Sequence, residues 1–273
     1  APSYGKGQSE QALGWLLKEI DAKPYISTKV MLDTARLDDI PGQVERSLHE
    51  SLQRMDRKSV DLFQLHNAIE PAVSASAITP DHVLRNNGVA DALERVRQKG
   101  LTKYIGFTSL GDAASLRQII DSGRFDSAQV YYNMLNPSAG RTMPKRWTGH
   151  DFGKLIAACK KQKMGIMVIR VFAAGVLATE VRHGREVIIT RATELATEER
   201  RAKTVFAGLG EKYGTRAQTA LRFVLANPAI SCAIIGLAET AHLEEALAGA
   251  KKGPLPKTAL EKLEKLYAAN FDL

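Results

Sequence analysis

Short apolar runs alternate with longer amphipathic runs along this chain, and this alternation restricts the possible folds more than any other feature. Few polar residues alternate within the apolar runs, which is typical of parallel strands covered on both faces. Helical spacing of apolar residues between the runs predicts helices, most clearly at residues 41–55 and 88–100. The pattern therefore predicts repeated βα units joined by right-handed crossovers. The expected strands are residues 25–30, 60–66, 103–109, 127–133, 165–171 and 231–236.

Two long segments, 67–87 and 172–196, interrupt this rhythm. Loops of such length in a compact domain are usually binding loops or lids rather than linkers. Composition does not shift along the chain, so we expect one domain over residues 1–273. No G-x-G-x-x-G motif follows a strand, which argues against a Rossmann fold. A (β/α) barrel, whose chemistry gathers at the C-terminal ends of its strands, is the better expectation.

The charge and the apolar runs exclude several classes of partner. The formal net charge is +8 and the isoelectric point is about 9.4, but Lys and Arg are scattered and interleaved with acids. Without a basic stripe carrying aromatic residues, no nucleic-acid partner is expected. The best apolar run, 165–178, is too short to span a bilayer and contains Arg170. We therefore expect no membrane association.

Two cysteines, Cys159 and Cys232, lie far apart in apolar surroundings. This usage predicts two buried thiols in a reducing compartment rather than a disulfide or a metal pair. With no charged-then-apolar leader at the start, the sequence indicates a cytoplasmic protein, and no metal site is expected.

Polar side chains occur where the predicted strands end, although the bodies of those strands are apolar. Each has an ordinary alternative, since a lysine at a strand end often extends to water and a histidine can be a hydrogen-bonded core residue. Their joint occurrence, together with Tyr4 in the opening turn, favours a common site at one rim. The strand-end residues are Lys29, His66, Thr108, Ser109, Asn133 and Arg170, with Gln129 earlier in its strand.

Five segments resemble, in the same order, signature segments of the aldo-keto reductase superfamily: "APSYGKGQSEQALG", "YISTKV", "VERSLHESLQRMDRKSVDLFQLHN", "YIGFTS" and "SAQVYYN". The closing "PAISCAIIGLAETAHLEEAL" is similar to the adenosine-binding segment of that family, and "VIRVFAAGVL" resembles a bacterial branch with aldose and L-fucose-type dehydrogenases. The resemblance implies a (β/α)8 TIM barrel that binds NADP or NAD across its C-terminal mouth. Family membership slightly favours NADP, but the sequence does not decide between the two.

The resemblance also implies a catalytic group made of Tyr4, Lys29 and His66. The family adds an aspartate five residues before the tyrosine, a position that would fall upstream of Ala1. Six strands are found where a closed barrel has eight. We therefore expect that the first one or two strands, with this aspartate, precede the sequence.

Cofactor contacts implied by the resemblance fall into two sets. Thr108, Ser109 and Gln129 match positions that hold the nicotinamide carboxamide, and Arg170 stands where an aromatic residue often stacks on that ring. The segment from Gly236 to Glu245 matches the adenosine end. In this segment His242 replaces a basic residue that commonly contacts the 2′-phosphate, Glu239 stands nearby, and Glu245 matches an adenine contact.

The function implied is an NAD(P)(H)-dependent oxidoreductase that interconverts a carbonyl (an aldehyde, ketone or sugar lactone/lactol) and an alcohol, with Tyr4 as general acid and base. The expected partner is a small-molecule substrate, and the oligomeric state is open. Two alternatives remain. One is a non-catalytic aldo-keto reductase-like subunit that senses a cofactor or binds a partner. The other is a Schiff-base aldolase with Lys29 as nucleophile.

Overall fold

The structure is a computed structural model that describes residues 1–184, 186–190 and 193–272. It contains two compact units, Ala1–Gln129 with Lys161–Met164, and Val130–Lys160 with Gly165–Leu273. The boundary falls within strand β6 (Ser127–Tyr131). We describe each unit by itself.

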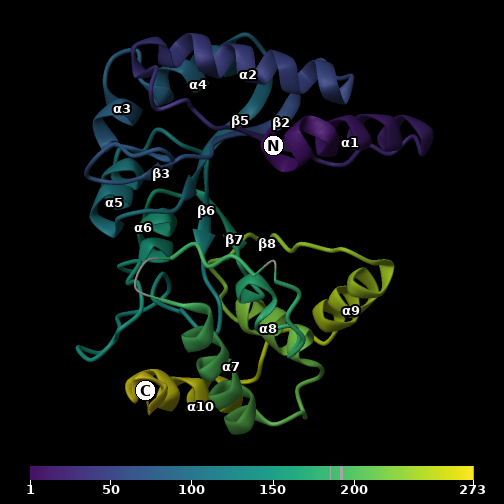
Figure 1. Ribbon diagram of the computed structural model, residues 1–273, viewed down its shortest axis with the longest axis vertical. Coiled ribbons are helices and arrows are strands. Elements are labelled where there is room, and N and C mark those ends of the chain that lie inside the picture. Colours follow the sequence, from purple (N-terminus) through teal and green to yellow (C-terminus); the bar gives the residue numbers. More distant parts are fainter. Residues whose placement is uncertain (185, 191–192, 273) are drawn as a thin grey trace. The chain divides into compact units, whose positions relative to one another are not determined.

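The first unit is built on a parallel sheet in the order β1-β2-β5, with helices packed against it (Figure 1). Lys29 of β1 is opposite Gln64 of β2, and Leu65 of β2 is opposite Phe107 of β5. The strands predicted at 25–30, 60–66 and 103–109 are thereby confirmed. The elements are η1 (Tyr4–Gly7), α1 (Gln8–Glu19), β1 (Ser27–Val30), η2 (Leu37–Asp39), α2 (Ile40–Met55), β2 (Val60–Leu65), α4 (Val89–Gln98), β5 (Thr102–Ser109) and α5 (Ala113–Asp121).

Helix α2 shows how the sequence sets these elements. The carboxylate of Asp39 accepts a hydrogen bond from the Gly42 amide at 3.0 Å, and Pro41 occupies the first turn, where a missing N–H costs nothing. The helix ends at Met55 and is capped by Asp56, which adopts a left-handed conformation. Its buried face includes Val44, Leu48, Leu52 and Met55, which have the helical spacing that predicts a helix at residues 41–55.

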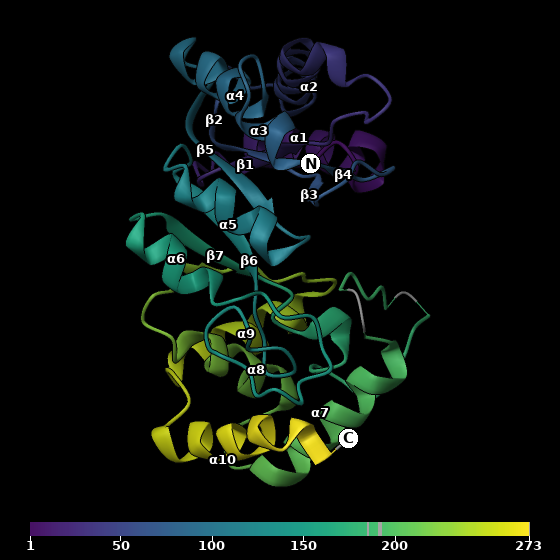
Figure 2. The same cartoon turned by 90° about the vertical axis from the view of Figure 1, so that its left-hand side faces the viewer.

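The insertion after β2 contains regular structure that the sequence did not predict. Strands β3 (Ala68–Ile69) and β4 (Ala77–Ile78) pair in parallel, and helix α3 (Pro80–Leu84) follows them (Figure 2). Ile69 also bridges to Gly111 in the loop after β5. A Cβ on Gly111 would lie 2.1 Å from the Ile69 carbonyl oxygen, so only glycine permits this approach.

The second unit contains the parallel pair β7 and β8 together with several helices (Figure 1). Strand β7 ends before Arg170, whose φ of 62° is left-handed, and β8 is only two residues long. Cys232 in β8 is exposed, so the prediction of two buried thiols is wrong for this residue, because the short strand leaves its side chain uncovered. The elements are α6 (Leu155–Lys161), β7 (Gly165–Ile169), η3 (Ala173–Gly175), α7 (Leu195–Leu209), α8 (Arg216–Leu225), β8 (Cys232–Ala233), α9 (Thr240–Lys251), α10 (Lys257–Ala268) and η4 (Asn270–Asp272).

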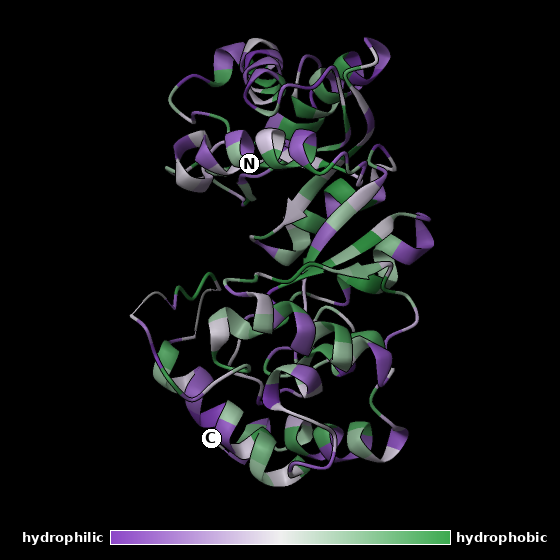
Figure 3. Ribbon diagram, turned by 90° about the vertical axis from the view of Figure 1, so that its right-hand side faces the viewer, coloured by the Kyte–Doolittle hydropathy of each residue, from purple (hydrophilic) through white to green (hydrophobic). Residues whose placement is uncertain are grey.

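Hydrophobic residues are concentrated in the strands, whereas hydrophilic residues are frequent on the helices (Figure 3). This distribution is typical of parallel strands covered by helices. The predicted α/β class with a parallel sheet is confirmed. Among the described residues, no helix combines the length and apolar character needed to cross a membrane.

Candidate active site and cofactor-binding residues

Tyr4, Lys29 and His66 come from three separate segments of the first unit and lie together. Tyr4 is in η1, Lys29 is in β1, and His66 directly follows β2. The backbone N–H of His66 donates to the Val30 carbonyl at 2.8 Å, which extends the β1–β2 pairing by one residue. The ends of two adjacent parallel strands thus place the amine and the imidazole at the same edge of the sheet.

The turn that carries Tyr4 depends on left-handed backbone. Gly5, Lys6 and Gly7 have φ values of 59°, 52° and 92°, and α1 begins at the next residue. A Cβ on Gly7 would lie 2.8 Å from Cδ of Arg54, so the turn and the arginine share a space that glycine leaves open.

The Tyr4 side chain contacts both of the others. The Lys29 ammonium donates a hydrogen bond to the Tyr4 hydroxyl, with 3.1 Å between Nζ and Oη. The Tyr4 and His66 rings meet edge to face, with centroids 5.9 Å apart and planes at 85°. Tyr4 is 48% exposed, so the residue is open to an external molecule. This arrangement places an ammonium and an imidazole beside the phenol of Tyr4.

His66 is uncharged at neutral pH. Burial lowers its pKa to about 4, and the positive charge of Lys29 acts in the same direction. An uncharged imidazole carries one N–H donor and one acceptor nitrogen, so it is able to orient a carbonyl oxygen by hydrogen bonding.

A buried carboxylate behind these residues was missed by the sequence reasoning. Glu10 of α1 is 3% exposed and accepts hydrogen bonds from Thr28 Oγ1 at 2.5 Å and Arg54 Nε at 2.7 Å. These contacts join α1, which follows the Tyr4 turn, to the strand residue next to Lys29. The available signal was spacing, since Glu10 shares the buried helix face with Gly14 and Leu17.

Asn67 was also missed, although it directly follows His66. Its side chain accepts from the Leu32 amide at 2.7 Å and donates to the Leu32 carbonyl at 3.1 Å. The amide thereby acts as a further rung between the loops after β1 and β2. A fully buried asparagine in a loop needs such partners.

The residues predicted to hold the nicotinamide carboxamide are buried in the first unit. Thr108 and Ser109 end β5, and Gln129 lies in β6. Thr108 Oγ1, Ser109 Oγ and Gln129 Oε1 have no hydrogen-bond partner among the described residues. Buried polar atoms without partners are uncommon, and these three match what an amide ligand requires. The residues present therefore fit a carboxamide group.

Two other strand-end residues lie in the second unit. Asn133 donates to the Arg170 carbonyl at 2.9 Å and accepts from the amides of Leu135 and Asn136, so it shapes the backbone there. The Arg170 guanidinium donates to the Val187 carbonyl at 2.7 Å.

The adenosine-like segment of the second unit leads into α9. Gly236 has open space where a Cβ would stand. Glu239 precedes the first residue of α9, and the ring of His242 accepts from the Ala238 amide at 3.4 Å. Glu245 accepts a hydrogen bond from Thr215 Oγ1 at 2.5 Å. This last contact links the segment to the start of α8.

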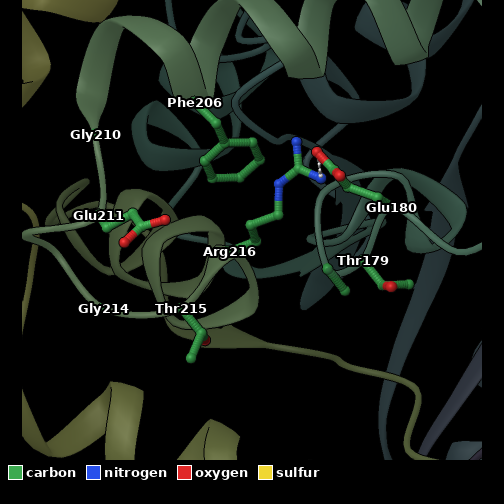
Figure 4. Close-up of a pocket in the computed structure, with 9 residues that line it drawn as sticks. Thr179, Glu180, Phe206, Gly210, Glu211, Gly214, Thr215 and Arg216 are labelled. Atoms are coloured by element: carbon green, nitrogen blue, oxygen red, sulfur yellow. Dashed lines mark ion pairs between the residues drawn. The ribbon is translucent and has the colours of Figure 1, made fainter.

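A pocket of about 740 Å³ opens next to Thr215 in the second unit (Figure 4). Arg216 extends into it, pairs with Glu180 at 2.8 Å and lies 4.3 Å from the centre of the Phe206 ring. Figure 4 shows Glu211 apart from this pair, on the side of Gly210. The lining residues are Ala178, Thr179, Glu180, Phe206, Gly210, Glu211, Gly214, Thr215 and Arg216.

Two curated proteins show weak similarity along this chain. L-galactose dehydrogenase from Arabidopsis thaliana is 24% identical over 251 residues, which cover 91% of this chain and 71% of the plant enzyme. D-threo-aldose 1-dehydrogenase from a Pseudomonas species is 26% identical over 205 residues, covering 65% of this chain. The matched part spans 56% of the length of the Pseudomonas enzyme.

Solved structures show the same fold. The holo form of aldo-keto reductase AKR11C1 from Bacillus halodurans superimposes with a TM-score of 0.75 at 18% identity, over 98% of this chain and 81% of the other. Its apo form gives 0.68 at 17% identity. The predicted relation to aldo-keto reductase barrels is confirmed at the level of fold. The sequence profile of the Aldo/keto reductase family matches residues 1–268, so this chain belongs to the aldo/keto reductase family of oxidoreductases.

Proposed function

We propose that the protein interconverts a carbonyl compound and an alcohol by hydride transfer, with Tyr4 as general acid and base. The observation that carries this proposal is the hydrogen bond from Lys29 to the Tyr4 hydroxyl beside the His66 ring. A phenol held by an ammonium is suited to both directions of proton transfer, because the ammonium stabilises the phenolate.

A nicotinamide dinucleotide, when bound, supplies or accepts the hydride. During reduction, Tyr4 gives its phenolic proton to the substrate oxygen, and Lys29 holds the phenolate that results. During oxidation, the phenolate takes the proton back from the alcohol. The neutral imidazole of His66 donates a hydrogen bond to the same oxygen and orients it. Thr108, Ser109 and Gln129 would hold the carboxamide of the bound dinucleotide through their unpartnered atoms.

The names of the curated relatives support sugars as the substrate class. Both are dehydrogenases of an aldose, so we propose that a cyclic sugar hydroxyl is oxidised to a lactone. Aldehydes and small ketones are the other candidates. The single-domain organisation and the cytoplasmic location predicted from the sequence stay predictions.

A pair of variants tests this function. Tyr4→Phe removes the proton donor and is expected to lower turnover of aldoses with NAD or NADP at least 100-fold, a typical general acid–base contribution. The affinity for the dinucleotide, followed by fluorescence titration, is expected to change little. Lys29→Met is expected to move the pH profile of oxidation to higher pH.

Tyr25→Phe is the matched control, because Tyr25 is 88% exposed and has no part in the proposed chemistry, so turnover of this variant should equal that of the parent. Substantial turnover of Tyr4→Phe at saturating cofactor would disprove the proposed acid–base role. Trapping of a substrate on Lys29 by borohydride would instead support the aldolase alternative.

A further inference from the structure

The pocket beside α8 has a distinctive charge pattern. Two carboxylates line it, those of Glu180 and Glu211, against the single guanidinium of Arg216. Arg216 is already paired with Glu180 at 2.8 Å. Among the described residues, no Lys or Arg forms an ion pair with Glu211. The pocket therefore holds one more negative than positive charge, and the surplus lies at Glu211.

The start of α8 does not offset this surplus. A helix N-terminus carries a partial positive charge that attracts anions. Here Thr215 caps the helix by accepting from the Gln218 amide at 3.2 Å, and its hydroxyl donates to the Glu245 carboxylate. A carboxylate is thus already placed at this helix end, through the threonine.

The same contact relates the pocket to the cofactor. Glu245 is the residue that the family resemblance assigns to adenine, and Thr215 both contacts Glu245 and lines the pocket. An adenosine end held at Glu245 would therefore have its ribose within reach of this cavity. A volume of about 740 Å³ is ample for a sugar.

We propose that this pocket receives the adenosine ribose as a free 2′,3′-diol, with Glu211 as the selecting residue, so that the chain prefers NAD(H) to NADP(H). This inference rests on the proposed dinucleotide-dependent function. A ribose hydroxyl can donate a hydrogen bond to the Glu211 carboxylate. A 2′-phosphate would instead place a second negative charge beside that carboxylate, and the two groups would repel each other. The preference runs against the one expected from family membership alone.

Adenosine fragments test the proposal without any turnover. We expect 5′-AMP to bind at least 10-fold more tightly than 2′,5′-ADP by isothermal titration calorimetry, and NADH more tightly than NADPH. Added salt should narrow the difference, because it screens the repulsion. Glu211→Gln should bring the two fragments closer in affinity, and Glu211→Lys should reverse the preference.

Glu261→Lys provides the matched control. It changes the net charge equally at a residue of α10 that is 58% exposed and lies outside both the lining residues and the segment Gly236–Glu245, so the preference should stay that of the parent. Equal or tighter binding of 2′,5′-ADP to the parent would overturn the proposal, as would an equal response to Glu211→Lys and Glu261→Lys.

The test also separates this inference from the proposed function. If Tyr4-dependent turnover persists while the fragments show no discrimination, only the pocket assignment fails. If discrimination is found but Tyr4→Phe remains active, the dinucleotide site stands and the proposed chemistry fails.

Discussion

Glu10 is an unusual residue for the inner face of a helix, because carboxylates are rarely buried without partners. Burial alone would raise its pKa, but the hydrogen bonds from Thr28 and Arg54 outweigh this effect and leave the pKa below its ordinary value. The carboxylate is therefore charged in the folded protein and fastens the Tyr4-bearing segment to β1 and α2.

Replacing Glu10 should therefore cost stability. Glu10→Gln leaves Arg54 facing an amide and is expected to lower the free energy of unfolding by about 2–3 kcal/mol, measured by urea denaturation. Glu50→Gln is the control, because Glu50 is 64% exposed and 3.7 Å from the same arginine. Its loss should be below about 1 kcal/mol. Equal losses in the two variants would contradict the role given to the buried carboxylate.

At the scale of elements, the packing of α1 on α2 depends on a glycine. A Cβ on Gly14 would lie 2.6–2.8 Å from three backbone atoms of Met55, so the helices approach too closely for any side chain there. Glycine in a helix interior normally weakens the helix by about 1 kcal/mol relative to alanine. Here the close approach outweighs that propensity.

Gly14→Ala is accordingly expected to lower the free energy of unfolding by about 1–3 kcal/mol, in spite of the gain in helix propensity. Gly208→Ala in α7 provides the comparison, because its Cβ would make only an ordinary contact, 3.7 Å from Leu266 Cδ1. That variant should be neutral or slightly stabilised in thermal melts. A stabilised Gly14→Ala protein would show that α1 moves away from α2 at little cost.

Elements with a clear periodicity of apolar residues were predicted from the sequence, and elements without one were not. The main strands and the α2 and α4 helices were predicted within a few residues, because burial imposes a clear period on their apolar residues. The two-residue strands β3 and β4 carry no period and were missed. Tyr4, Lys29 and His66 were found through motif resemblance. Glu10 was not found, because a carboxylate in a helix ordinarily indicates a face that is exposed to solvent.

Over the whole molecule, the two units have opposite responses to pH. His66 and Glu10 in the first unit both have lowered pKa values, so the unfolded chain binds their protons first as the pH falls. Their environments therefore lose stability in acid, for His66 between about pH 6.5 and 4. Burial raises the pKa of Glu198 in the second unit to about 7, so stability around it falls as the pH rises from about 4.5 past 7.

Hydrogen exchange resolved by peptide measures both responses. Corrected for intrinsic rates, protection of residues 60–66, which end at His66, is expected to fall on going from pH 7 to pH 5. Protection of residues 195–209 should fall on going from pH 5 to pH 8. Glu198→Gln should remove most of the second change, because an amide does not ionise. If protection changed in the same direction with pH in both segments, the result would contradict these burial effects.

The Asn67 side chain has a consequence for how such a protein diversifies. Its two bonds to Leu32 clamp the loops after β1 and β2 to each other, immediately beside the imidazole. The segment from β3 to α3 follows Asn67 in the sequence. Mutations in that stretch are therefore free to change which molecules dock, while the proton-handling groups keep their spacing.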